Sequence, residues 1–182
     1  MAHPEQQRFM QSVKDNFPLY FQGSKKVLDV GSADINGNAR YLFNGCDNLE
    51  YTGCDVAMAP NVDIVSFCHE LPFDDNYFDV IFSGECFEHD VFWAASLRKI
   101  YQMLKPGGLF FFTCATTGRA EHGTSRTSAG DSYTTSIGIE YYRNLTVDDA
   151  SIVLSPDNNF KEYKFFTREN PLYDLYFYGI KE

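Results

Sequence analysis

Basic residues are scarce in this chain of 182 residues. Lys and Arg together number 15 against 25 Asp and Glu, which gives a formal net charge of −10. A protein that binds nucleic acid through the phosphate backbone needs cations that displace condensed counterions. We therefore expect no nucleic acid among the partners of this protein.

Cysteine pairs and long apolar runs are also missing. The five cysteines form no CxxC pair, so neither a zinc ribbon nor a disulfide framework is indicated, and mostly buried, reduced thiols are expected. No apolar run approaches the roughly 20 residues of a membrane helix. The polar stretch at residues 4–8 is unlike a signal peptide. These features favour a cytoplasmic protein that has no membrane partner.

The sequence does contain apolar, strand-like runs that alternate with helical segments. The expected strands are 26–30, 51–56, 62–65, 80–83 and 109–114, followed by two aromatic strands at 161–167 and 175–181. The expected helices are 4–16, which Pro18 ends, 91–105, which Asp90 caps, and 146–154, which Thr146 caps. This alternation, without repeats or linkers, predicts an open α/β sheet in one domain of residues 1–182, in which residues 1–25 carry the N-terminal helix.

The stretch Val27-Leu28-Asp29-Val30-Gly31-Ser32-Ala33 is typical of a buried parallel strand that ends in a small-residue turn. Such turns let a ligand approach the backbone closely. Asp55 ends the second strand roughly two dozen residues later, where nucleoside-binding sheets place a carboxylate that accepts from ribose hydroxyls. The alternative is an ordinary strand-to-helix turn with an ordinary turn aspartate.

Residues 116–144 begin as a Thr-, Ser- and Gly-rich connection at the end of the fifth strand, so an active-site lid is expected there. His122 stands beside Glu121, which makes it the first choice for a general base, and His89 is the second. The alternatives are a solvated loop histidine at position 122 and a structural histidine at position 89. An acceptor pocket is expected to include Arg119, Arg126, Tyr133 and Tyr141, in which the two arginines would suit an acidic group.

A metal site is not expected. Glu85, Glu88, His89 and Asp90 are close in sequence, but a helix would place them on alternate faces. A second acidic pair after the fifth strand is also missing from the sequence.

Together, these features resemble the class I S-adenosylmethionine-dependent methyltransferases. The matching stretches cover about residues 26–115, in the family's order: Val27-Leu28-Asp29-Val30-Gly31, Asp55, Leu71-Pro72-Phe73, Phe78-Asp79-Val80-Ile81, Glu88-His89 and Leu104-Lys105-Pro106-Gly107-Gly108. The resemblance implies a doubly wound, mostly parallel, seven-stranded Rossmann-like sheet with an antiparallel C-terminal edge strand. It also implies S-adenosyl-L-methionine as cofactor, bound at the C-terminal ends of the strands.

The resemblance assigns cofactor contacts residue by residue. Asp29 would orient the methionine end, Asp55 would hold the ribose, and Gly31, Ser32 and Ala33 would line both. The remaining expected contacts are Val56, Phe67, Cys68, Ser83 and Glu85. Two positions depart from the family's pattern: Ala33 replaces its second glycine, and Phe67 replaces the aspartate that often holds the adenine amino group.

The expected function is methyl transfer to a small polar acceptor, most plausibly a hydroxyl on a metabolite or sugar-like molecule, by a monomer or homodimer. A methyltransferase-like module that binds without catalysis is one alternative. An NAD-type dehydrogenase domain is another, but the turn is not G-x-G-x-x-G and a separate substrate domain does not follow.

Overall fold

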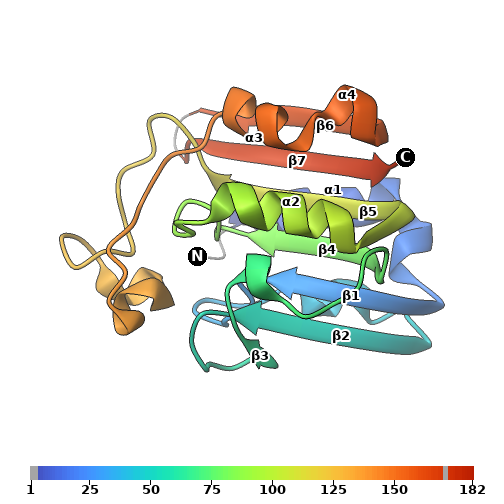
Figure 1. Ribbon diagram of the computed structural model, residues 1–182, viewed down its shortest axis with the longest axis horizontal. Coiled ribbons are helices and arrows are strands. Elements are labelled where there is room, and N and C mark those ends of the chain that lie inside the picture. The colour runs from blue at the N-terminus through green and yellow to red at the C-terminus, as the bar shows by residue number, and fades with distance from the viewer. Residues whose placement is uncertain (1–3, 170–171) are drawn as a thin grey trace.

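One mixed β-sheet forms the centre of the protein in the computed structural model, which describes residues 4–169 and 172–182 (Figure 1). It has seven strands in the order β3-β2-β1-β4-β5-β7-β6. They are β1 (Ser24–Val30), β2 (Asn48–Asp55), β3 (Ile64–Val65), β4 (Phe78–Gly84), β5 (Leu104–Ala115), β6 (Phe160–Arg168) and β7 (Asp174–Lys181).

The first five strands are parallel, and β7 runs antiparallel to both of its neighbours, β5 and β6. β6 therefore forms the edge of the sheet, and the C-terminal strand β7 lies between β5 and β6. The expected fold class, with its antiparallel C-terminal finish, is confirmed.

Helices cover both faces of this sheet (Figure 1). The α-helices are α1 (Pro4–Asn16), α2 (Trp93–Met103), α3 (Val147–Leu154) and α4 (Pro156–Asn159). Five 3-10 helices lie in the connections: η1 (Pro18–Phe21), η2 (Arg40–Phe43), η3 (Cys68–Glu70), η4 (Ala129–Asp131) and η5 (Tyr133–Ile137). Among the described residues, no helix has both the length and the apolar composition that crossing a bilayer would need.

Two hydrophobic cores result, one on each face, because successive side chains of a strand point to opposite sides. In β5, Phe110 and Phe112 belong to the core under α2 and α3. Phe111, between them, belongs to the core under α1. β5 is buried on both faces, as its almost wholly apolar sequence predicts.

Two local predictions differ from the structure. The helix predicted at 91–105 is α2, which begins at Trp93 and ends at Met103. Asp90 is not its N-cap: the Asp90 carboxylate accepts from the Phe92 amide at 2.7 Å and the Ser96 hydroxyl at 2.5 Å. The strand predicted at 109–114 begins earlier, at Leu104, so Lys105-Pro106-Gly107-Gly108 is part of an irregular strand.

The cap of α3 agrees with the sequence. The Thr146 hydroxyl accepts from the Asp149 amide, and the Asp149 carboxylate accepts from the Thr146 amide, which is a complete capping box. This cap fixes the point at which the long loop after β5 rejoins the folded body.

Candidate active site

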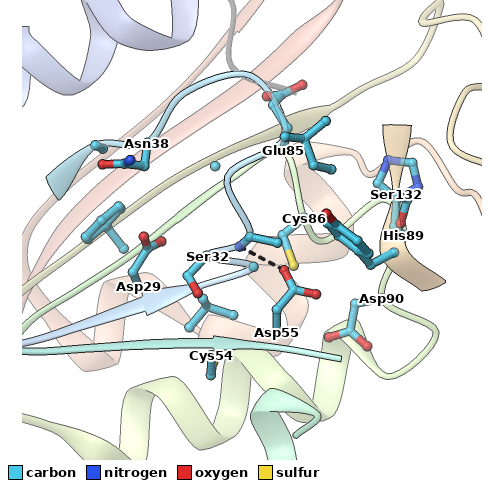
Figure 2. A pocket seen from close by; sticks show the side chains of 18 of the residues that line it. Asp29, Ser32, Asn38, Cys54, Asp55, Glu85, Cys86, His89, Asp90 and Ser132 are labelled. Carbon is cyan, nitrogen blue, oxygen red and sulfur yellow. Dashed lines mark hydrogen bonds between the residues drawn. The ribbon is translucent and has the colours of Figure 1, made fainter. Parts of the chain in front are cut away.

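A cavity opens at the C-terminal ends of β1, β2 and β4 (Figure 2). Its floor is made of the turn after β1 and the first residues after β2 and β4. Its walls come from α1, which contributes Gln6, Gln7 and Met10, and from residues 131–134 of the loop after β5. The loop projects past the arrowheads of the parallel strands in Figure 1. The residues predicted to form a lid thus contribute to the ligand edge of the sheet.

Gly31 is required by the geometry of the turn after β1. Its φ is +75°, and a Cβ atom there would lie 2.5 Å from the Cβ of Cys86. The amides of Gly31 and Ser32 both donate to the Cys54 carbonyl, at 2.9 and 3.0 Å. The turn is therefore fixed against β2, and its backbone, free of bulky side chains, borders the cavity.

Asp29, at the end of β1, is buried and lies on the cavity wall. Its Oδ2 accepts from the Tyr51 hydroxyl at 2.6 Å and from the Asn61 amide at 3.1 Å. Burial raises the pKa of this carboxyl to about 7, although both hydrogen bonds oppose the shift. A cation placed beside Asp29 would stabilise its ionised form.

Asp55 connects two segments of the cavity floor. Its Oδ2 accepts from the Ala33 amide at 3.1 Å, and its Oδ1 accepts from the Val56 amide at 2.7 Å (Figure 2). A carboxylate has about four lone-pair positions. Asp55 can therefore hold the turn in place and still accept from a diol in the cavity.

Most of the expected cofactor contacts come together in this one cavity. Those that line it are Asp29, Gly31, Ser32, Ala33, Asp55, Val56, Phe67, Cys68 and Glu85. Ser83 is the exception: it is fully buried, it does not line the cavity, and its hydroxyl donates to the Val30 carbonyl at 2.9 Å. The Ser83 side chain thus joins β4 to β1 instead of facing the cavity.

The two candidate histidines lie beside each other, and only His89 lines the cavity. Their ring centroids are 4.9 Å apart with the rings nearly perpendicular. The His122 Nε2 atom lies 3.9 Å from Oε1 of the fully buried Glu88. The sequence predicted Glu121 as the partner of His122, but the Glu121 carboxylate instead accepts from Thr124 and Arg126.

Of the four residues expected in an acceptor pocket, only Tyr133 lines the cavity. Arg119 donates to the Leu172 carbonyl at 2.6 Å and pairs with the buried Asp174 at 3.0 Å. Arg126 is exposed and pairs with Glu121, and Tyr141 lies outside the cavity lining. Carboxylates of the fold therefore neutralise both arginines, and neither lines the cavity.

Sequence reasoning missed several contributors to the site. Gln6 and Met10 reach the cavity from α1. Asn61, at φ +70°, joins Asp29 to the Ser32 carbonyl, and Tyr51 donates to Asp29. The apolar spacing in α1 does not indicate that Met10 lines a cavity. The position of Tyr51 follows from the β1–β2 register, and that of Asn61 from the path of the loop after β2; a single sequence gives neither.

An adenosyl cofactor fits the donor set of this cavity. The glycine turn leaves room for close approach, Asp55 keeps acceptor positions for ribose hydroxyls, and Asp29 offers a carboxylate to a cationic group. Phe67 makes an edge contact with Phe92 at 5.2 Å between ring centroids, which gives the position before Cys68 an aromatic wall. These are the groups that the expected cofactor needs.

Known methyltransferases match the part of the chain that forms the floor of this cavity. Residues 28–112 match the family model described as a methyltransferase domain. The phthiotriol/phenolphthiotriol dimycocerosates methyltransferase of Mycobacterium tuberculosis is 34% identical over 103 residues, which are 48% of this chain. The match covers only 37% of that relative, so the chain spans well under half of its length.

Two solved structures share the fold across nearly the whole chain. The 1,6-didemethyltoxoflavin-N1-methyltransferase of Burkholderia thailandensis, with bound S-adenosylhomocysteine, has a TM-score of 0.68 and 16% identity, covering 98% of this chain and 78% of that chain. The phosphoethanolamine N-methyltransferase 2 of Haemonchus contortus, in complex with S-adenosyl-L-methionine, has a TM-score of 0.64 and 16% identity. The match covers 96% of this chain and 52% of that chain.

The family model covers the stretch from β1 to β5, where the glycine turn, Asp55 and the Glu88-His89 pair are found. The neighbours share the sheet that carries this stretch. The chain therefore contains a methyltransferase domain over residues 28–112, on a sheet that it shares with S-adenosylmethionine-dependent methyltransferases.

Proposed function

We propose that this protein transfers a methyl group from S-adenosyl-L-methionine to a hydroxyl of a small polar acceptor. The observation that carries the proposal is the composition of one cavity. It combines the cofactor-binding turn and Asp55 on its floor with His89 on its wall (Figure 2). In that view Asp29 and His89 lie on opposite sides, with Asp55 and Cys86 between them.

The bound cofactor would supply a methyl group that is already activated on a sulfonium. The residues of this chain supply position and a suitable environment for an in-line displacement. Asp55 would accept from the ribose hydroxyls, the Gly31–Ala33 backbone would border the ribose and methionine, and Asp29 would balance the cationic methionine end. Gln6 and Met10 of α1 would cover this end from the other side.

A neutral acceptor fits the cavity better than an acidic one. Arg119 and Arg126, which both lie within the lid, are engaged with carboxylates. The lid instead contributes Ser132, Tyr133 and Thr134 to the cavity lining. The hydroxyl groups of these residues can donate hydrogen bonds to a polyhydroxylated acceptor and accept them from it. The named relatives act on a dimycocerosate lipid, a toxoflavin precursor and phosphoethanolamine, so they do not select one acceptor class.

His89 would receive the acceptor's proton. A hydroxyl needs such a base, because it is weakly nucleophilic while protonated. Desolvation, with a contribution from the neighbouring His122, lowers the pKa of His89 to about 3, so its imidazole is neutral and can accept. The low pKa makes it a weak base, and we expect transfer to it only in the aligned complex, in concert with methyl transfer.

A screen with radiolabelled S-adenosylmethionine against sugars, polyols, phenols and amines tests the proposal. We expect label in a hydroxyl-bearing acceptor, and a loss of about 100-fold or more in kcat for His89→Gln, with cofactor affinity unchanged. His69→Gln is the matched control, because His69 lies on η3 and does not line the cavity.

Label only in amines would contradict hydroxyl transfer. Equal turnover by His89→Gln and the wild type would remove His89 as the base. Cofactor binding without turnover on any acceptor class would favour the non-catalytic module.

A further inference from the structure

We propose that Glu88, His89 and His122 form a binding site for a divalent transition-metal ion, with Zn²⁺ as the best match. One donor atom from each residue can be chosen so that all three lie within 4.8 Å of one another. We call these residues the Glu-His-His cluster. It adjoins the cavity through His89, the base proposed above. Because a neutral imidazole has one lone-pair nitrogen, a metal-bound His89 would not also take a proton, so metal occupancy and base action are alternative states of this residue.

The donor atoms of the cluster are buried without hydrogen bonds. Both Glu88 oxygens, both His89 ring nitrogens and the His122 Nε2 atom lack a hydrogen-bond partner among the described residues. Glu88 is 0% exposed and His89 is 4% exposed. The backbone amides of Glu88 and Ala115 lie close to the Glu88 carboxylate, and the Tyr141 backbone lies close to the His89 ring. Burying a polar group without a partner is unfavourable, so several such groups in contact call for a missing ligand.

The tautomer of His122 points to a cation. Its Nδ1 lies 3.2 Å from the Ala120 carbonyl, which can only accept, so Nδ1 carries the proton. Nε2 then directs a lone pair toward Glu88 Oε1, 3.9 Å away, which is too far for a hydrogen bond. Metal-binding histidines commonly have this arrangement, with the second nitrogen donating to a carbonyl.

The surroundings enclose the cluster. The ring of Tyr142 lies 5.5 Å from the His89 ring and 5.0 Å from the His122 ring, between centroids. The loop backbone closes over His89 at Gly123, where a Cβ atom would lie 2.5 Å from the His89 ring. The two imidazoles and the carboxylate are therefore held by a loop packed directly against them.

Two imidazoles and one carboxylate form a donor set that suits Zn²⁺ and its first-row neighbours rather than Mg²⁺ or Ca²⁺. Bonds of about 2.0–2.2 Å would require the donors to approach by roughly 1 Å, which small rotations of the rings can supply. A fourth position toward the cavity would take water or an oxygen of a small ligand.

This proposal reverses the expectation from the sequence that a metal is absent. That expectation placed residues 85–90 on a helix, with their side chains on alternate faces. In the structure they form turns between β4 and α2, and the loop after β5 adds His122.

Metal analysis of untagged protein tests the proposal. Protein is incubated with Zn²⁺, desalted and measured by mass spectrometry, and Co²⁺-loaded protein is examined for visible d–d bands. We expect about one Zn²⁺ per chain and a Co²⁺ spectrum without a strong thiolate charge-transfer band. Glu88→Gln and His122→Gln should each weaken Zn²⁺ binding at least 10-fold. His69→Gln should bind as the wild type does.

Several outcomes would overturn the proposal. They are wild-type protein that retains no Zn²⁺ and shows no Co²⁺ bands, variants that retain as much metal as the wild type, and a thiolate band that places the metal on a cysteine. Circular dichroism and calorimetry with S-adenosylhomocysteine establish that each variant is folded. Because these readouts are independent of turnover, failure of the metal site is distinguishable from failure of methyl transfer.

Discussion

At the scale of single residues, the site depends on carboxyl groups that the fold desolvates. Asp29, Asp55, Glu88 and Asp90 all have pKa values raised chiefly by burial. Asp29 is the most informative of these, because its pKa of about 7 falls within the range in which most assays are run. Its protonation therefore affects ligand binding under ordinary conditions.

Cofactor affinity should depend on pH through Asp29. Below about pH 7 the carboxyl is protonated, and a cationic ligand must displace that proton, so affinity falls as the pH is lowered. Between pH 7.5 and 5.5 we expect S-adenosylmethionine affinity to fall by a factor on the order of ten. Calorimetry at three pH values measures this change.

Asp29→Asn should abolish most of this dependence, because an amide does not titrate in this range. The exposed Asp47→Asn should keep it and serves as the control. A wild-type affinity that is flat from pH 5.5 to 7.5 would show that Asp29 does not face the cationic end of the cofactor.

At the scale of elements, apolar period and capping residues predicted most helices and strands. Phe9 and Val13 lie on the buried face of α1, and Thr146 with Asp149 caps α3 as expected. The β5 boundary was missed because Lys105-Pro106-Gly107-Gly108 has turn composition, yet the chain pairs at Leu104 and again from Leu109, with the irregular residues between. Tertiary pairing here overrides local propensity.

The loop after β5 shows the limit of sequence reasoning most clearly. Its composition and place predicted a lid, and residues 131–134 do reach the cavity. The ion pairs of Arg119 and Arg126 were not predicted, because the identity of an ion-pair partner depends on which segment lies alongside. Asp174 in β7 and Glu121 in the same loop take these guanidinium groups.

Arg119 should contribute to stability rather than to acceptor binding. Its guanidinium pairs with Asp174, which is 0% exposed, so Arg119→Gln removes the cation from a buried carboxylate. We expect a loss of about 3 kcal/mol in the free energy of unfolding, measured by urea denaturation. Arg126→Gln, at the exposed pair with Glu121, should cost less than about 1 kcal/mol.

Equal losses for the two arginine variants would contradict this assignment. A large change in acceptor KM for Arg119→Gln, without loss of stability, would restore the role that the sequence suggested.

Cofactor binding should also order two distant elements together. The first turns of α1 and residues 131–134 both line the cavity. Hydrogen exchange with and without S-adenosylhomocysteine should therefore show added protection at residues 6–10 and 131–134, while α3 and the edge strand β6 stay unchanged. Protection confined to the glycine turn would indicate that α1 and the loop do not cover the ligand.

At the scale of the whole molecule, the ordered motifs from Val27 to Gly108 predicted a methyltransferase domain and a seven-stranded sheet, and both are confirmed. Each motif lies at the C-terminal end of a parallel strand, and these strand ends meet at one edge of the sheet. The order of the motifs along the chain therefore determines most of the cavity floor. The walls come from α1 and the loop after β5, whose positions depend on long-range packing. The floor was therefore predicted well, whereas the acceptor side and the Glu-His-His cluster were not.

Calorimetric titration of the purified protein shows whether this cavity binds an adenosyl cofactor. Parallel titrations with S-adenosylmethionine, S-adenosylhomocysteine and NAD should give micromolar affinity for the two adenosyl-sulfur compounds and none for NAD. Binding of NAD alone, or of none of the three, would contradict the assignment of the cavity floor.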